Sequence, residues 1–146
     1  MVIFEIKREW YKMKKILIIV LCLTLLTSFA SCNISYVSSY KALGLVRNEM
    51  GDRGSVKFGK LDGTVVLKLK MNGTGLENSI GCKATLDEGE INVYYDIFGV
   101  KELLFNLKAG ESIDERRGYI ESGHRIYIII ETVTPAKGSV EIDLRK

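Results

Sequence analysis

Hydrophobic and polar residues alternate with a period of two through most of the chain after residue 54. The clearest case is the segment 64–72, where Val65, Leu67 and Leu69 share one face and Lys68 points the other way. A period of two is typical of a β-strand with one buried face. The pattern therefore predicts a β-rich body with a core on one side of each strand.

The same alternation predicts about eight strands, separated by short turns rich in glycine, asparagine and aspartate. The strands are expected at 55–60, 64–72, 80–86, 90–98, 101–108, 111–117, 125–134 and 137–144, with a short piece at 119–121. Asp62-Gly63 has the composition of a tight hairpin turn, and further turns are expected at 72–75, 87–89 and 109–111. No helical period of ten or more residues lies between the strands, so the fold class is all-β, an antiparallel β-sandwich.

The segment 39–50 is the one helix candidate in this part of the chain. Ser39 is a suitable N-cap residue, but Gly44 inside the segment costs about 1 kcal/mol relative to alanine. The alternative is that residues 33–54 form an irregular tether in front of a sandwich domain at 55–146.

An apolar run of a different kind precedes this body. Lys14 and Lys15 follow Met13, residues 16–26 are almost entirely apolar, and the run ends in small and polar residues up to Cys32. A basic flank, an apolar core of about 7–15 residues and small residues at the end form the pattern of a secretory signal. A membrane-spanning helix needs about 20 apolar residues, so an uncleaved anchor helix is the less favoured alternative.

The end of this run, Phe29-Ala30-Ser31-Cys32, resembles the lipobox of bacterial lipoproteins. The resemblance implies cleavage between Ser31 and Cys32, a lipid on the Cys32 thiol, and a location on the extracytoplasmic face of the cell membrane. Residues 1–32 are then a helical signal peptide. Residues 1–12 carry two acids, which is unusual before such a run, so Met13 rather than Met1 is the expected start.

Removal of the signal changes the charge balance of the chain. Residues 1–32 hold five of the 21 basic and two of the 18 acidic residues, which leaves 16 of each in residues 33–146. This net charge of zero, without a basic cluster, argues against a nucleic-acid partner. Cys22 leaves with the signal and Cys32 takes the lipid, so Cys82 has no disulfide partner. Its place in an alternating strand predicts a buried thiol, with a reactive thiol as the alternative.

The C-terminal half, from Phe105 through Gly123-His124-Arg125 to Ile142, resembles small lipoproteins of Gram-positive bacteria. It is also similar to the jelly-roll modules, of carbohydrate-binding type, attached to secreted enzymes. The match covers about 40 residues of strands and turns. It implies a jelly-roll form of the sandwich and a glycan among the candidate partners.

Candidate catalytic and metal sites are few. His124 is the only histidine, and an exposed turn is its expected place. The sequence also lacks a Gly-x-Ser-x-Gly nucleophile elbow. Two acidic clusters have oxygen donors suited to calcium, although solvated turn acids are the favoured explanation. They are Asp87, Glu88 and Glu90, and Glu111, Asp114 and Glu115. No cofactor site is predicted.

Tyr94 and Tyr127 alternate away from the strongest apolar faces of their strands, which makes them the first candidates for a ligand face. The leading hypothesis is a lipid-anchored cell-envelope protein with a binding or structural sandwich and no catalysis. A carbohydrate-binding module is the second hypothesis, and a small envelope enzyme is the third. The membrane, a glycan and another envelope protein are the expected partners.

Overall fold

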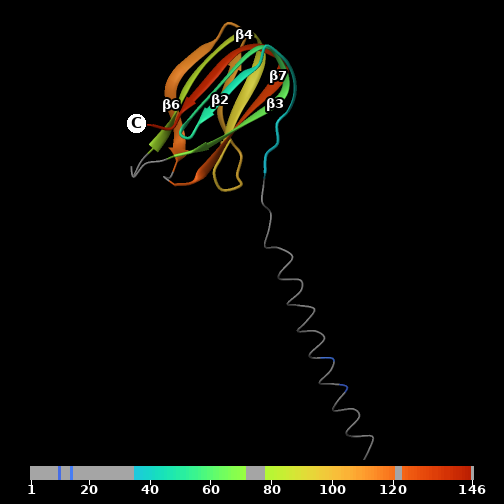
Figure 1. The fold of residues 1–146 in the computed structure, drawn as a ribbon, viewed down its shortest axis with the longest axis vertical. Coiled ribbons are helices and arrows are strands. Elements are labelled where there is room, and N and C mark those ends of the chain that lie inside the picture. Colours follow the sequence, from blue (N-terminus) through green and yellow to red (C-terminus); the bar gives the residue numbers. More distant parts are fainter. Residues whose placement is uncertain (1–9, 11–13, 15–34, 72–77, 121–122, 146) are drawn as a thin grey trace, which may run out of the picture. The chain divides into compact units, whose positions relative to one another are not determined.

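The computed structural model describes residues 10, 14, 35–71, 78–120 and 123–145 (Figure 1). The ranges 35–71, 78–120 and 123–145 consist of strands and connecting turns, without a helix. All strand pairs are antiparallel, which confirms the predicted all-β antiparallel class. The seven strands are β1 (Ser39–Leu43), β2 (Val46–Met50), β3 (Arg53–Lys70), β4 (Asn78–Asp96), β5 (Glu102–Lys108), β6 (Ser112–Ile120) and β7 (Arg125–Asp143).

Three long strands form the frame of the sandwich. β3, β7 and β4 lie side by side in that order, β1 and β2 pair with β3, and β5 and β6 pair with β4. Each long strand bends in its middle, so its two halves belong to two packed layers (Figure 1). Layer A contains β2, β6 and the segments 53–58, 81–86 and 138–143. Layer B contains β5 and the segments 64–70, 90–96 and 125–131, with β1 beside the bend of β3.

Irregular pairing marks the bends. The register shifts between Phe58 and Thr64 in β3, and between Leu86 and Ile91 in β4. Gly63 and Gly89 lie in these stretches with φ angles of 124° and 83°. Residues that have a side chain adopt such angles only under strain. A Cβ on Gly63 would also lie 2.8 Å from the Cα of Tyr40. The predicted turns at Asp62-Gly63 and 87–89 are therefore wrong: glycine bends a continuous strand there instead of ending it.

The same correction applies to three predicted pairs of strands. Each pair, 55–60 with 64–72, 80–86 with 90–98, and 125–134 with 137–144, is one strand that crosses both layers. The predicted turn at 109–111 is confirmed between β5 and β6.

The core lies between the layers, and alternate residues of each long strand point into it. Val56, Leu67, Ile128 and Val140 are buried in it, as the period of two predicts. The layers touch directly where the backbone of Gly54 approaches the side chains of Leu67 and Leu69.

The predicted helix at 39–50 is wrong. Residues 39–43 and 46–50 form β1 and β2, which pair with successive parts of β3. Ten backbone pairings along one edge override a weak helical preference that already contained Gly44. The segment is thus part of the sandwich, and the compact unit begins at Tyr36.

Candidate functional site

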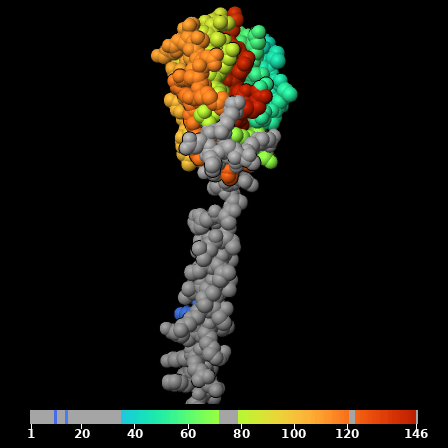
Figure 2. All heavy atoms as spheres, turned by 90° about the vertical axis from the view of Figure 1, so that its left-hand side faces the viewer, coloured from blue at the N-terminus to red at the C-terminus, as the bar shows by residue number. Residues whose placement is uncertain are grey.

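A hollow of 610 Å³ lies on the outer face of layer A. Its lining comes from all five strands of the layer, and we call it the layer A groove. Figure 2 looks onto this face, with β6 in orange, β4 in yellow-green, β7 in red and β2 in blue-green. Its lining residues with side chains on this face include Asn48, Arg53, Ser55, Lys83, Asp114, Arg116, Glu141 and Asp143.

Strand register places these side chains in two rows across the groove. The first row runs from Arg53 through Asp143 and Gly81 to Arg116. The second row contains Asn48, Ser55, Glu141, Lys83 and Asp114 in that order. Basic and acidic groups alternate along both rows, so hydrogen-bond donors and acceptors are interleaved across the groove.

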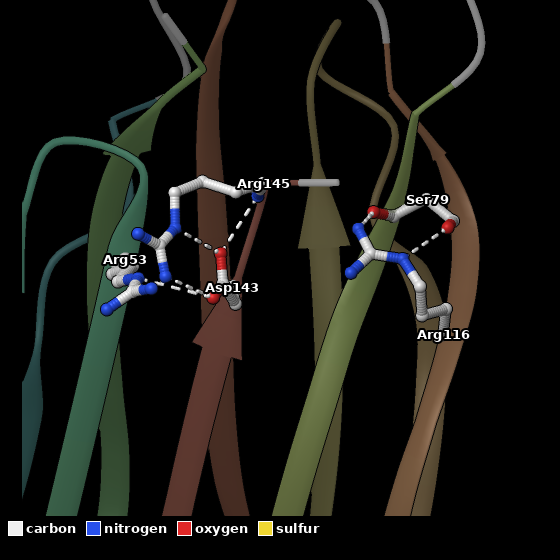
Figure 3. Close-up of polar contacts among 5 residues, drawn as sticks. All are labelled: Arg53, Ser79, Arg116, Asp143 and Arg145. Atoms are coloured by element: carbon white, nitrogen blue, oxygen red, sulfur yellow. Dashed lines mark hydrogen bonds and ion pairs between the residues drawn. The ribbon is translucent and has the colours of Figure 1, made fainter.

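Gly81 leaves room in the floor of the groove, next to the guanidinium of Arg116, which Figure 3 shows with its partner Ser79. The guanidinium of Arg116 is held by Ser79: Nε donates to the hydroxyl at 2.8 Å and Nη2 donates to the carbonyl. Nη1 of Arg116 lies 3.1 Å from the position a Cβ on Gly81 would occupy. The missing side chain at position 81 therefore makes room for the guanidinium at the base of the groove.

Asp143 organises the other end of the first row (Figure 3). Its carboxylate accepts hydrogen bonds from Arg145, from Nη2 at 2.9 Å and from Nε at 3.1 Å. Nε of Arg53 lies 3.2 Å from the same carboxylate. Two guanidinium groups that share one carboxylate are held in fixed directions.

The thiol of Cys82 does not face the groove, although its backbone lines it. The side chain is 2% exposed and its Sγ donates to the carbonyl of Ile80 at 3.4 Å. Burial raises the pKa of this thiol to about 11, against the lowering effect of Arg117 and Arg116. Because the thiolate is the nucleophilic form, a thiol with this raised pKa is a poor nucleophile. The burial of Cys82 that the sequence predicts is confirmed.

The structure places Tyr94 and Tyr127 together on the outer face of layer B. Tyr94 pairs with Ile129, two residues from Tyr127 on the same face of β7. Each ring is partly covered: Nζ of Lys101 lies 4.0 Å from the centroid of Tyr94, and the ring of Tyr36 is 5.5 Å from that of Tyr127. Their role in ligand binding stays a prediction.

The remaining sequence candidates lie elsewhere. His124 contacts Phe98 at the start of β7, with 5.0 Å between ring centroids. Among the residues that the structure describes, no three His, Cys, Asp or Glu side chains gather as a metal site. Neither acidic cluster, Asp87, Glu88 and Glu90 or Glu111, Asp114 and Glu115, therefore forms one.

Ser31 and Cys32, the predicted cleavage and lipidation site, lie outside the described residues. Within the described ranges, no helix is both long and apolar enough to cross a membrane.

Comparisons with known proteins give no family. No family model matches the sequence, and no curated protein matches it. Among solved structures, a family 29 carbohydrate-binding module has a TM-score of 0.39 at 11% identity, over 78% of this chain and 80% of that one. A variant of that module with mannohexaose has a TM-score of 0.41 at 12% identity, over 73% and 77%. Drosophila melanogaster CENP-C bound to CAL1 has a TM-score of 0.33 at 20% identity, over 79% and 84%. Likenesses at these scores do not assign the chain to a family.

Proposed function

We propose that this protein is a non-catalytic binding protein of the cell envelope, tied to the membrane by a lipid on Cys32. The layer A groove is its binding site, and the ligand is a carbohydrate. The observation that carries the proposal is the groove itself, a hollow of 610 Å³ across five strands with charged side chains of both signs.

The mixture of charges favours a neutral, hydroxyl-rich ligand. Three basic and three acidic side chains lie along the two rows of the groove: Arg53, Lys83 and Arg116, and Asp114, Glu141 and Asp143. A polyanion would meet the carboxylates, which carry its own sign of charge. A sugar hydroxyl both donates and accepts, so neighbouring hydroxyls can bind an ammonium or guanidinium on one side and a carboxylate on the other.

Fixed guanidinium groups favour binding as well. Ser79 holds Arg116, and Asp143 holds Arg53 and Arg145, before any ligand arrives. Side chains that are already ordered lose less conformational entropy on binding. The first row of the groove is therefore preorganised for hydrogen bonding to a ligand.

Glycan binding by residues 33–146, with a matched pair of lysine variants, tests this proposal. Lys83→Ala removes an exposed ammonium that lies between Glu141 and Asp114 in the second row. Loss of a hydrogen bond to a charged group costs about 1.5–3 kcal/mol, so the affinity should fall by roughly tenfold or more. Lys57→Ala is the control, because Lys57 is also exposed on layer A but lies outside the groove lining.

A glycan array gives the first hit and calorimetry measures both variants against it. The proposal predicts weaker binding by Lys83→Ala and unchanged binding by Lys57→Ala. Binding lost in Tyr94→Ala or Tyr127→Ala but kept in Lys83→Ala would move the site to layer B. The absence of any glycan that binds the folded domain would refute the carbohydrate assignment.

A further inference from the structure

An apolar patch lies at the end of the sandwich where β4 meets β5. Phe98 and Val100, in the connection between these strands, are 66% and 64% exposed, and Tyr119 of β6 is exposed beside them. Together with Tyr95, Ile97 and Glu102 they line a hollow of 310 Å³. Neighbouring exposed apolar side chains that also line a hollow are a candidate contact surface.

The loop that carries the patch is held in place. The amide of Gly99 donates to Oδ1 of Asp96 at 2.6 Å, and Asp96 is only 2% exposed. Phe98 also packs edge-on against the ring of His124. The apolar side chains therefore project from a structured loop.

The start of the domain is attached at the same point. The hydroxyl of Tyr36 donates to Oδ2 of Asp96 at 2.5 Å, so one buried carboxylate binds both the first residue of the compact unit and the loop with the patch. In Figure 1 the blue-green start of the domain and the yellow-orange loop after β4 lie toward the same end of the sandwich. Tyr36, the first residue of the compact unit, is therefore hydrogen-bonded to a residue two positions before Phe98.

The length of that chain limits how far the patch can be from an anchor. Cys32 precedes Tyr36 by four residues, which span at most about 14 Å when fully extended. A lipid on Cys32 would hold this end of the sandwich within that distance of the bilayer surface. The inference rests on the proposed anchor.

We propose that the Phe98 loop, the connection between β4 and β5, forms a second membrane contact together with Tyr119 of β6. In this contact Phe98, Val100 and Tyr119 enter the lipid interface beside the anchor. Aromatic side chains with one apolar and one polar end suit that interface. The loop would add its own apolar contact to the membrane binding that the lipid on Cys32 gives. The tether also raises the local concentration of lipid around the loop, so a small apolar patch is enough.

A tryptophan reporter tests the contact directly, because the only tryptophan of the chain, Trp10, lies in front of Cys32. Residues 32–146 are coupled through Cys32 to a thiol-reactive phospholipid in vesicles of phosphatidylcholine and phosphatidylglycerol. Cys82 is buried, so coupling occurs at Cys32. Phe98→Trp reports on the loop, and Val46→Trp, at a 65% exposed site on β2, is the matched control.

The proposal predicts that Phe98→Trp fluorescence shifts to shorter wavelength and is quenched by bromine-labelled lipid. Val46→Trp should stay unshifted and unquenched. Equal, water-like emission from both reporters in the coupled protein would overturn the proposal. It would also be overturned if Tyr119→Ala abolished glycan binding while the emission of Phe98→Trp stayed water-like.

The anchor is tested separately by mass spectrometry of the protein from its native membrane. An unmodified Cys32 would contradict the anchor. Quenching of Phe98→Trp in coupled vesicles would still report the affinity of the loop for lipid, so the two failures are distinguishable.

Discussion

At the scale of single residues, Asp96 is the most informative position outside the groove. It is a buried carboxylate that accepts hydrogen bonds from the Tyr36 hydroxyl and the Gly99 amide, and so joins the start of the domain to the β4–β5 loop. A buried acceptor that loses its donor costs more than an exposed one, because water does not replace the bond.

Tyr36→Phe should therefore lower the free energy of unfolding by about 1–3 kcal/mol. The phenylalanine keeps the ring contact with Tyr127 and removes only the hydroxyl that Asp96 accepts. Urea unfolding of residues 33–146 measures the change, with Tyr40→Phe on β1 as the exposed control. Equal stabilities of wild type and Tyr36→Phe would contradict the role of the hydrogen bond.

The same bond predicts a pH dependence. The hydrogen bond to Asp96, together with burial, raises the pKa of Tyr36 from 10.0 to about 12. The folded pKa lies above the unfolded one, so the stabilisation is complete below pH 10.0 and is lost as the pH rises through about 12. The difference in stability between wild type and Tyr36→Phe should shrink over that window.

At the scale of elements, the bends of the long strands decide the architecture. Gly89 has a φ of 83°, and a Cβ there would lie 2.7 Å from the Cα of Ala136. β4 therefore crosses from layer A to layer B only where a residue without a side chain meets the backbone of β7.

Gly89→Ala should destabilise the domain by about 2–4 kcal/mol, from the positive φ and the backbone contact together. Gly110→Ala is the matched control: Gly110 has a φ of 82°, but a Cβ there meets no atom within 4 Å. It should cost only the conformational part, about 1–2 kcal/mol. Denaturant unfolding compares the two, and equal losses would show that close approach at the bend is unimportant.

The bends also explain which strands the sequence could predict. Alternation alone predicts which residues of the segment Thr64 to Lys70 point to each face, because a strand with one buried face has a hydrophobic period of two. The turn at Asp62-Gly63 could not be separated from a bulge, since both use glycine at positive φ. The strands at 39–43 and 46–50 form by pairing with β3, which local preference does not reveal.

At the scale of the whole molecule, the groove could not be predicted from the sequence. Arg53, Gly81, Arg116 and Asp143 are far apart along the chain and meet only through the register of four strands. In contrast, Tyr94 and Tyr127 could be assigned to outward faces from alternation alone. Their partial cover by Lys101 and Tyr36 depends on tertiary contacts and could not.

The arrangement separates two surfaces of the domain. The layer A groove carries interleaved charges, which we propose bind a hydroxyl-rich ligand, and the Phe98 loop carries exposed apolar side chains. A protein tied to a membrane near its loop end would hold a glycan through the face of one layer.

The most direct test of the carbohydrate site is an NMR titration of residues 33–146 with a glycan identified on the array. The backbone amides of Gly81, Lys83 and Glu141 lie in the floor of the groove, and we expect their chemical shifts to move together with a single affinity. Shifts confined to the surroundings of Tyr94 and Tyr127, or of Phe98 and Tyr119, with the groove amides unmoved, would contradict the account.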